Sequence, residues 1–170
     1  PTIYNPVGSY RTTFTIPENW DGREIYLSFQ GVQSAFYVWV NGHQVGYSED
    51  SMTPKDFDIT SYIQPGENTL AVEVYRWSDG YYLEDQDMIR LSGIFRDVFL
   101  YSKPKVNIWD FSVATDLDDQ YVNATLTLSA ELRNLAMAEG IYKVEAQLYD
   151  GKQAVLPNPI VVDADVTGKN

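Results

Sequence analysis

Short runs of alternating apolar and polar residues follow one another along the first hundred positions, with turn residues about every 8–12 positions. The alternation is clearest in the run from Asn68 to Trp77, where Leu70, Val72 and Val74 share one face. Other expected strands of this part are 10–16, 24–30, 34–40, 43–47, 57–59 and 94–101. No segment here has a convincing 3.6-residue period. The pattern therefore predicts an all-β domain.

The dipeptide Asn41-Gly42 lies between two of these runs, 34–40 and 43–47. Asparagine and glycine tolerate the two positive φ angles of a type I′ turn at low cost. The sequence therefore predicts a tight hairpin at this point.

After Pro104 the runs become longer, and we place a domain boundary between Ser102 and Val106, which divides the chain into residues 1–103 and 104–170. The expected strands of the second part are 106–114, 121–132 and 141–149, followed by a turn at Asp150-Gly151. A sandwich of immunoglobulin type needs about seven strands and about 100 residues. The second domain is therefore expected to be truncated. The start at Pro1 also suggests a piece of a longer protein.

The composition excludes several classes of function. The 24 acidic residues against 12 Lys and Arg give a net charge of -12, which opposes binding to nucleic acid or to an anionic membrane. There is no cysteine, so disulfides and thiolate chemistry are absent. This fits the cytoplasm, and also a disulfide-free periplasmic protein. No apolar stretch is long enough to span a membrane.

The segment 78–88 interrupts the strand pattern and carries four carboxylates. Oxygen ligands of this kind suit hard cations, but the spacing does not match an EF-hand loop. Glu84, Asp85 and Asp87 could supply two carboxylates for glycoside hydrolysis, although a solvated acidic loop is the simpler interpretation. The Glu49-Asp50 pair is interpreted as an exposed turn. The single histidine, His43, is interpreted as an ordinary hairpin residue.

Three stretches are more specific than these patterns, and they occur in a fixed order. They are Asn-Pro-Val-Gly-Ser-Tyr-Arg at 5–11, Gly-Val-Gln-Ser-Ala-Phe at 31–36 continuing to Val-Asn-Gly at 40–42, and a third from Arg76 to Val98 that contains Glu-Asp-Gln-Asp-Met at 84–88 and Ser-Gly-Ile-Phe-Arg-Asp-Val at 92–98. Together they resemble the amino-terminal sugar-binding domain of the β-galactosidases of glycoside hydrolase family 2. The resemblance covers roughly residues 4 to 114 and weakens afterwards.

The resemblance implies a galactose-binding-domain-like jelly-roll sandwich over 1–103, with its amino-terminal part upstream of Pro1, and a partial immunoglobulin-like sandwich over 104–170. In the family, a separate barrel hydrolyses terminal β-galactosides such as lactose with retention, using two glutamates and Mg²⁺. No barrel motif is present, so the chain alone is expected to be inactive and to hold no complete cofactor site. By resemblance, Asp87 contacts bound galactose and ligates sodium in the intact enzyme, while Glu84 and Asp85 fix the loop.

The expected partners are therefore a β-galactoside and the barrel of the same protein, in a parent that is expected to be a homo-oligomer. Two alternatives stay open. The chain could be a stand-alone carbohydrate-binding module, which a concave face with several exposed Trp or Tyr would favour. It could also belong to another family 2 glycosidase, such as a β-glucuronidase or a β-mannosidase, because barrel residues settle the choice of substrate.

Overall fold

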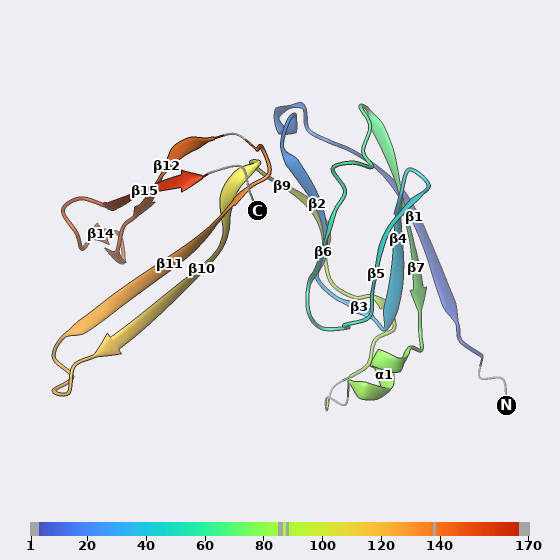
Figure 1. The fold of residues 1–170 in the computed structure, drawn as a ribbon. Helices are drawn as coiled ribbons and strands as arrows, with labels where there is room; N and C mark the ends of the chain where they lie inside the picture. The colour runs from blue at the N-terminus through green and yellow to red at the C-terminus, as the bar shows by residue number, and fades with distance from the viewer. Residues whose placement is uncertain (1–3, 85–86, 88, 138, 167–170) are drawn as a thin grey trace. The chain divides into compact units, whose positions relative to one another are not determined.

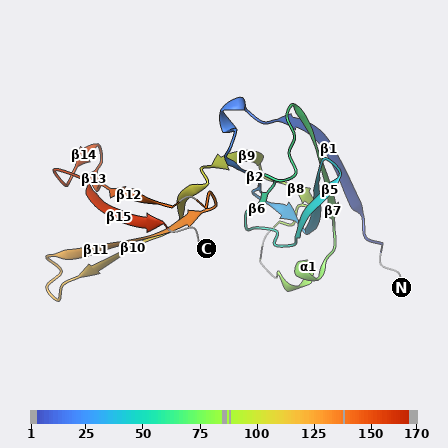
Figure 2. The same ribbon diagram turned by 45° about the horizontal axis from the view of Figure 1, so that its top comes forward.

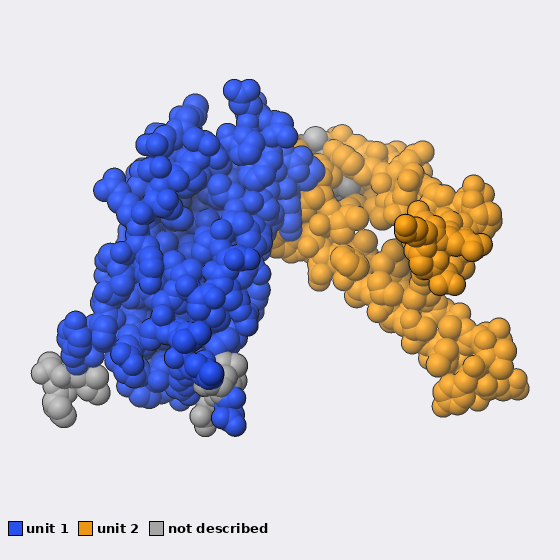
Figure 3. Space-filling view, turned by 180° about the vertical axis from the view of Figure 1, so that it is seen from behind, with its two compact units in different colours: residues 1–104 blue, residues 105–170 orange. Residues whose placement is uncertain are grey.

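The computed structural model describes residues 4–84, 87, 89–137 and 139–166. The chain forms two compact units, residues 1–104 and residues 105–170. They are coloured blue and orange in Figure 3, and each is described by itself. Among the described residues, helix is limited to the 3-10 turn η1 (Glu18–Trp20) and the short α1 (Asp79–Leu83). None of the helices in these ranges is long and apolar enough to cross a membrane. The prediction of an all-β chain is therefore confirmed.

The first unit contains a four-stranded antiparallel sheet in the order β1-β7-β4-β5 (Figures 1 and 2). Its strands are β1 (Val7–Thr15), β7 (Glu67–Tyr75), β4 (Ala35–Val40) and β5 (His43–Ser48). A second, three-stranded sheet has the order β6-β2-β9. It consists of β6 (Lys55–Asp58), β2 (Glu24–Phe29) and β9 (Val98–Lys103). The short strands β3 (Val32–Gln33) and β8 (Gly93–Ile94) pair with each other.

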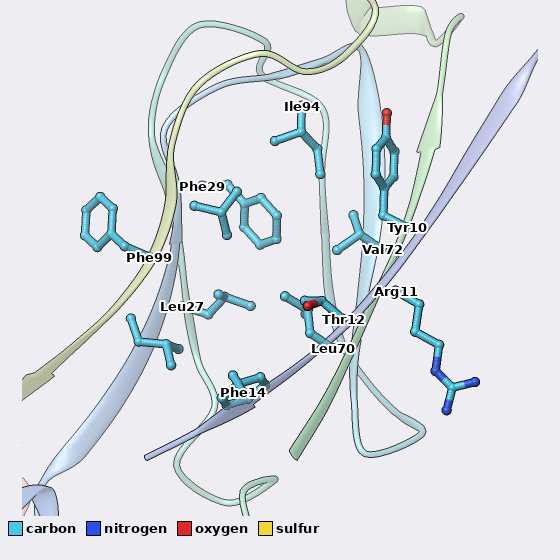
Figure 4. Close-up of a pocket in the computed structure, with 12 residues that line it drawn as sticks. Tyr10, Arg11, Thr12, Phe14, Leu27, Phe29, Leu70, Val72, Ile94 and Phe99 are labelled. Carbon is cyan, nitrogen blue, oxygen red and sulfur yellow. The ribbon is translucent and has the colours of Figure 1, made fainter. Parts of the chain in front are cut away.

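The core of the first unit lies between these two sheets. Phe29 of β2 packs against Phe36 of β4 with ring centroids 4.9 Å apart, and Phe57 of β6 packs edge-on against both. All six residues of β2 are buried, whereas β7 alternates strictly between core and surface. At one edge the sheets leave an apolar cavity of about 500 Å³ between β1 and β9, lined in part by Leu27 and Phe99 (Figure 4).

The predicted hairpin turn is confirmed, because Asn41 and Gly42 have φ angles of 51° and 82°. Asn41 has a second role that its sequence position does not reveal. Its amide donates to the Tyr62 carbonyl and to Asn68 Oδ1, and its own oxygen accepts from the Thr69 backbone N–H. The turn is thereby tied to the start of β7.

The second unit consists of three antiparallel strand pairs, β10-β11, β12-β15 and β13-β14. Their bounds are β10 (Val106–Leu117), β11 (Ala124–Asn134), β12 (Gly140–Ala146), β13 (Tyr149–Asp150), β14 (Gln153–Ala154) and β15 (Ile160–Val166). Gly151 supplies a φ of 59° at the predicted Asp150-Gly151 turn. The expected strand start at Tyr121 is wrong: Tyr121 has a φ of 56° in a turn, and the strand begins at Ala124.

Candidate functional site

The acidic segment begins as a short helix and not as a simple loop. Ser78 caps α1, because its hydroxyl accepts the Tyr81 backbone N–H at 3.2 Å. Asp79 follows in the first turn, where a carboxylate is favoured. The Ser-Asp pair was the signal that could have predicted this helix. After Leu83 the backbone leaves the helix at Glu84, and the stretch that contains Asp87 begins.

Hydrogen bonds fix both ends of that stretch. Glu84 Oε1 accepts the Ser51 backbone N–H at 3.1 Å, which ties the end of α1 to the segment after β5. From the other end, Arg90 donates to the Tyr81 carbonyl at 3.3 Å and to the Glu84 carbonyl at 3.1 Å. The Arg90 guanidinium also lies 4.4 Å from the centre of the Tyr81 ring. Arg90 is therefore bonded to α1 and to Glu84, the two ends that border this stretch.

The first of the three specific stretches is bound to the third. Asn5 Oδ1 accepts the Trp77 backbone N–H, and Asn5 Nδ2 donates to the Trp77 carbonyl, both at 2.9 Å. The Arg76 backbone N–H donates to the Pro6 carbonyl at 3.0 Å. A two-way amide bond of this kind fixes the chain where it enters α1. Asparagine before proline was a weak signal, and the sequence did not reveal this role.

The second stretch meets the third through the pair β3-β8, in which Val32 lies opposite Ile94. A side chain at Gly31 would come within 2.8 Å of the Phe95 ring and 2.9 Å of Arg96 Cδ, so only glycine fits there. Arg96 in turn donates to the carbonyls of Gln30 and Met52. The second and third stretches, which are far apart in the sequence, are thus in contact next to the acidic segment.

Asp87 is exposed, in a bend of the chain. Its neighbours Asp85, Gln86 and Met88 lie outside the described residues. Within the described part of the chain, no three His, Cys, Asp or Glu side chains gather as a metal cluster. An exposed carboxylate is chemically suited to be one ligand of a hard cation such as sodium. The sodium contact of Asp87, its sugar contact and the need of the parent for magnesium all stay predictions.

The other candidate residues have local roles. Asp50 accepts the backbone N–H groups of Met52 and Thr53, and hydrogen bonding, led by Thr53, holds the pKa of Asp50 below its usual range. Glu49 accepts the hydroxyl of Tyr47 at 3.1 Å. His43 is exposed at the start of β5, with its ring 6.2 Å from that of Tyr62. These contacts agree with a structural turn and a hairpin residue.

The sugar-binding domain of the glycosyl hydrolases of family 2 matches residues 1–104. The chain belongs to glycosyl hydrolase family 2. The resemblance inferred from the three stretches is thereby confirmed. Because the matched residues include all three of them, the anchored acidic segment is a part of this family domain.

Two curated relatives of this family 2 chain are β-galactosidases. The one from Priestia megaterium is 56% identical over 169 residues, which are 98% of this chain and 16% of the relative. The one from Clostridium acetobutylicum is 46% identical over 164 residues, 96% of this chain and 18% of the relative. The chain therefore spans less than a fifth of the length of these two relatives.

Solved structures share the fold. A β-glucuronidase from Bacteroides uniformis superposes with a TM-score of 0.85 at 23% identity, over 98% of this chain and 21% of that one. A family 2 member from Bacteroides cellulosilyticus gives a TM-score of 0.81 at 24% identity, over 96% of this chain and 22% of that one. At these identities the likeness establishes the sandwich fold and not a substrate.

Proposed function

We propose that this chain is the non-catalytic portion of a β-galactosidase that presents Asp87 to the galactose subsite of the intact enzyme. The observation that carries the proposal is the 56% identity to a β-galactosidase over 169 residues. In this proposal, which follows the family resemblance, a barrel elsewhere in that enzyme carries out the reaction, and two glutamates and magnesium in the barrel act on the glycosidic bond. The 170-residue chain by itself is expected not to hydrolyse a β-galactoside.

The anchoring of the acidic segment supports this role. A residue that reaches into another domain must be held at a defined position, because small misplacements of a contact weaken catalysis. The Asn5 amide and the Arg90 guanidinium supply that restraint on either side of the segment, and Asp87 is exposed between them. A carboxylate accepts hydrogen bonds from sugar hydroxyls and balances the charge of a sodium ion. Barrel groups would complete both sites.

The two alternatives have less support. Two solved β-glucuronidases from Bacteroides uniformis are 22–23% identical to this chain. The two β-galactosidases described above are 46–56% identical to it. A stand-alone carbohydrate-binding module would not account for nearly full coverage of this chain by a much longer enzyme. A cytoplasmic location and a homo-oligomeric parent are further proposals, which rest on composition and on the family resemblance.

The test is the substitution Asp87→Asn in the longer enzyme that contains this chain. It keeps the shape of the side chain and removes the charge that would hold sodium and a sugar hydroxyl. Loss of a charge-assisted hydrogen bond costs about 1.5–3 kcal/mol, so kcat/KM for a chromogenic β-galactoside should fall roughly tenfold to a hundredfold. The dependence of the rate on sodium concentration should change as well.

Asp119→Asn is the matched control, because Asp119 is also an exposed aspartate but lies in the β10-β11 turn. It should leave both the activity and the sodium dependence unchanged. Full activity and unchanged sodium dependence in Asp87→Asn would show that this segment does not contribute to the subsite.

A further inference from the structure

The outer face of the four-stranded sheet carries a row of aromatic residues that the core does not use. Tyr37 of β4 lies directly opposite Tyr47 of β5, and their ring centroids are 4.7 Å apart. Tyr75 of β7 packs edge-on against Tyr37 at 6.0 Å. Tyr47 is 41% exposed, and Tyr37 and Tyr75 are half-buried. The three rings form a row of contacts across three neighbouring strands, with interplanar angles of 43° between Tyr37 and Tyr47 and 75° between Tyr37 and Tyr75.

A small residue makes a hollow in this surface. In the register of the sheet Ala35 lies opposite Tyr75, next to the row that contains Tyr37 and Tyr47. Ala35 has only a methyl group, so the space that a larger side chain would occupy stays empty. Trp77 and Asp79, which follow β7, also line this hollow. The result is a cavity of about 270 Å³, the aromatic hollow, lined by Ala35, Tyr37, Tyr47, Tyr75, Trp77, Ser78 and Asp79.

Two tyrosine hydroxyls of the aromatic hollow are hydrogen-bonded to carboxylates. The Tyr47 hydroxyl donates to Glu49 Oε2, and the Tyr75 hydroxyl donates to Glu73 Oε1, both at 3.1 Å. Each carboxylate has further lone pairs, and Asp79 adds another carboxylate beside Glu49. The hydroxyl protons of both tyrosines are thereby used in hydrogen bonds within the protein. Trp77 and Ser78, which also line the hollow, carry donor groups. A neutral ligand with several hydroxyl groups, which can donate to the carboxylates and accept from these residues, therefore suits the aromatic hollow.

We propose that the aromatic hollow is a binding site for one neutral pyranose ring, such as the galactose unit of a β-galactoside. Flat aromatic faces bury the C–H face of a sugar, and carboxylates at the rim accept its hydroxyl protons. The volume lies just below the range of about 300–1,000 Å³ that is usual for small-molecule pockets, which suits a single ring. This site is distinct from Asp87, and none of its lining residues belongs to the segment 84–90.

Charge decides which sugars fit. The chain has a net charge of -12, Asp79 lines the aromatic hollow, and Glu49 and Glu73 are bound to the hydroxyls of two of its tyrosines. An anionic sugar such as a uronate meets like charges at short range, whereas a neutral hexoside does not. The rings pack against one another and do not stand apart as a cage. Tyr47 is the most exposed of the three rings and can offer one face to a ligand, which suits a sugar ring better than an organic cation enclosed on several sides.

The experiment is a nuclear magnetic resonance titration of the 170-residue chain with methyl β-galactoside. We expect weak, millimolar binding, with shift changes at the Trp77 indole and the backbones of Ala35 and Tyr47. Tyr47→Ala should weaken binding roughly tenfold, because it removes one stacking face. Tyr47→Phe keeps the ring and should stay within about threefold of the parent chain. This second variant also serves if Tyr47→Ala disturbs the edge strand.

Tyr10→Ala is the matched control, because Tyr10 has a similar exposure of 44% but does not line the aromatic hollow. It should leave the affinity unchanged. Galacturonate and tetramethylammonium are the comparison ligands, and both should bind more weakly than the neutral galactoside. Absence of shift changes, changes confined to the Asp87 segment, or tighter binding of either comparison ligand would overturn the proposal. Because Asp87→Asn is measured by turnover in the longer enzyme, failure of one proposal is distinguishable from failure of the other.

Discussion

The two units are built from similar alternating strands, but the apolar side chains are buried in the first unit and exposed in the second. In the first unit Phe36 and Val38 are 1% and 0% exposed, because two sheets face each other across them. In the second unit Phe111 is 66% exposed and Leu126 is 47% exposed. Among the described residues of that unit, no hydrophobic side chain is buried.

The difference shows what strand pairing alone achieves. A hairpin such as β10-β11 satisfies backbone hydrogen bonds, but it covers neither of its faces. Burial requires a second layer, and two-stranded sheets by themselves are marginally stable in water. The first unit has that second layer, and the three strand pairs of the second unit do not form it. We therefore expect the first unit to carry most of the stability of this chain.

The largest expected contrast comes from one substitution made in each unit. Phe36→Ala should lower the free energy of unfolding of the first unit by about 3–5 kcal/mol, because it opens a cavity between the sheets. Phe111→Ala should change the stability of the second unit by less than about 0.5 kcal/mol, because its ring is largely exposed. Urea unfolding followed by resonances of each unit measures both. A large cost for Phe111→Ala would show that its ring is packed.

A smaller contrast is expected between two asparagines. Asn68 is fully buried, and its side chain accepts from the Gln64 backbone N–H and from Asn41, while it donates to the Gln64 and Gly66 carbonyls. Asn68→Ala should cost about 2–3 kcal/mol, because it leaves buried partners unsatisfied.

Asn123 is exposed and donates to Asp118 Oδ2 at 2.8 Å. Asn123→Ala is therefore expected to cost less than about 1 kcal/mol in the same unfolding experiment. Equal costs at the two positions would contradict the contrast in burial between the units.

An acid titration should show that a hydrogen-bonded aspartate stabilises a turn in each of the two units. Backbone N–H groups, led by that of Val122, hold the pKa of Asp118 below its usual range, as hydrogen bonds do for Asp50 in the first unit. A lowered folded pKa stabilises the turn above the ordinary value of about 4, and this contribution is lost as pH falls through the lowered value. Amide exchange at residues 120–123 should therefore quicken at acid pH, beyond the intrinsic trend.

Asp118→Asn should abolish this additional pH dependence in the second unit and leave the response around Asp50 unchanged. If the turn at 120–123 responds to acid equally with and without the Asp118 carboxylate, another group controls it.

The smallest effect is expected at alkaline pH. Partial burial, followed by the hydrogen bond to Glu49, raises the pKa of Tyr47 to about 12. A raised tyrosine pKa contributes stability below the ordinary value of about 10, and this contribution is lost as pH rises towards 12. Ultraviolet absorbance should lose one late-titrating phenolate component in Tyr47→Phe, while Tyr75 and Tyr101, whose pKa values are also raised, keep theirs. Loss of a component that titrates near the ordinary tyrosine value of about 10 would instead show that Tyr47 is not shielded on the sheet.

Much of the local structure was predictable, because it depends on neighbouring residues. The Asn41-Gly42 turn follows from two residues that tolerate positive φ, and β7 follows from strict alternation. The two-way bond of Asn5 to Trp77 was not predictable, since it joins positions 72 residues apart. Neither was the aromatic hollow, because it depends on the register that places Ala35 opposite Tyr75.

Leu70, Val72 and Val74 in β7 alternate in the same way as Leu126, Leu128 and Ala130 in β11. The sequence by itself determined that each set would share one face of a strand, because successive side chains point to opposite faces of a pleated backbone. Only the tertiary structure decided that the first set is buried, at 3–8% exposure, and that Leu126 and Leu128 are 45–47% exposed. Burial depends on whether a second sheet, built from distant residues, covers the face, and alternation along one strand carries no information about that sheet.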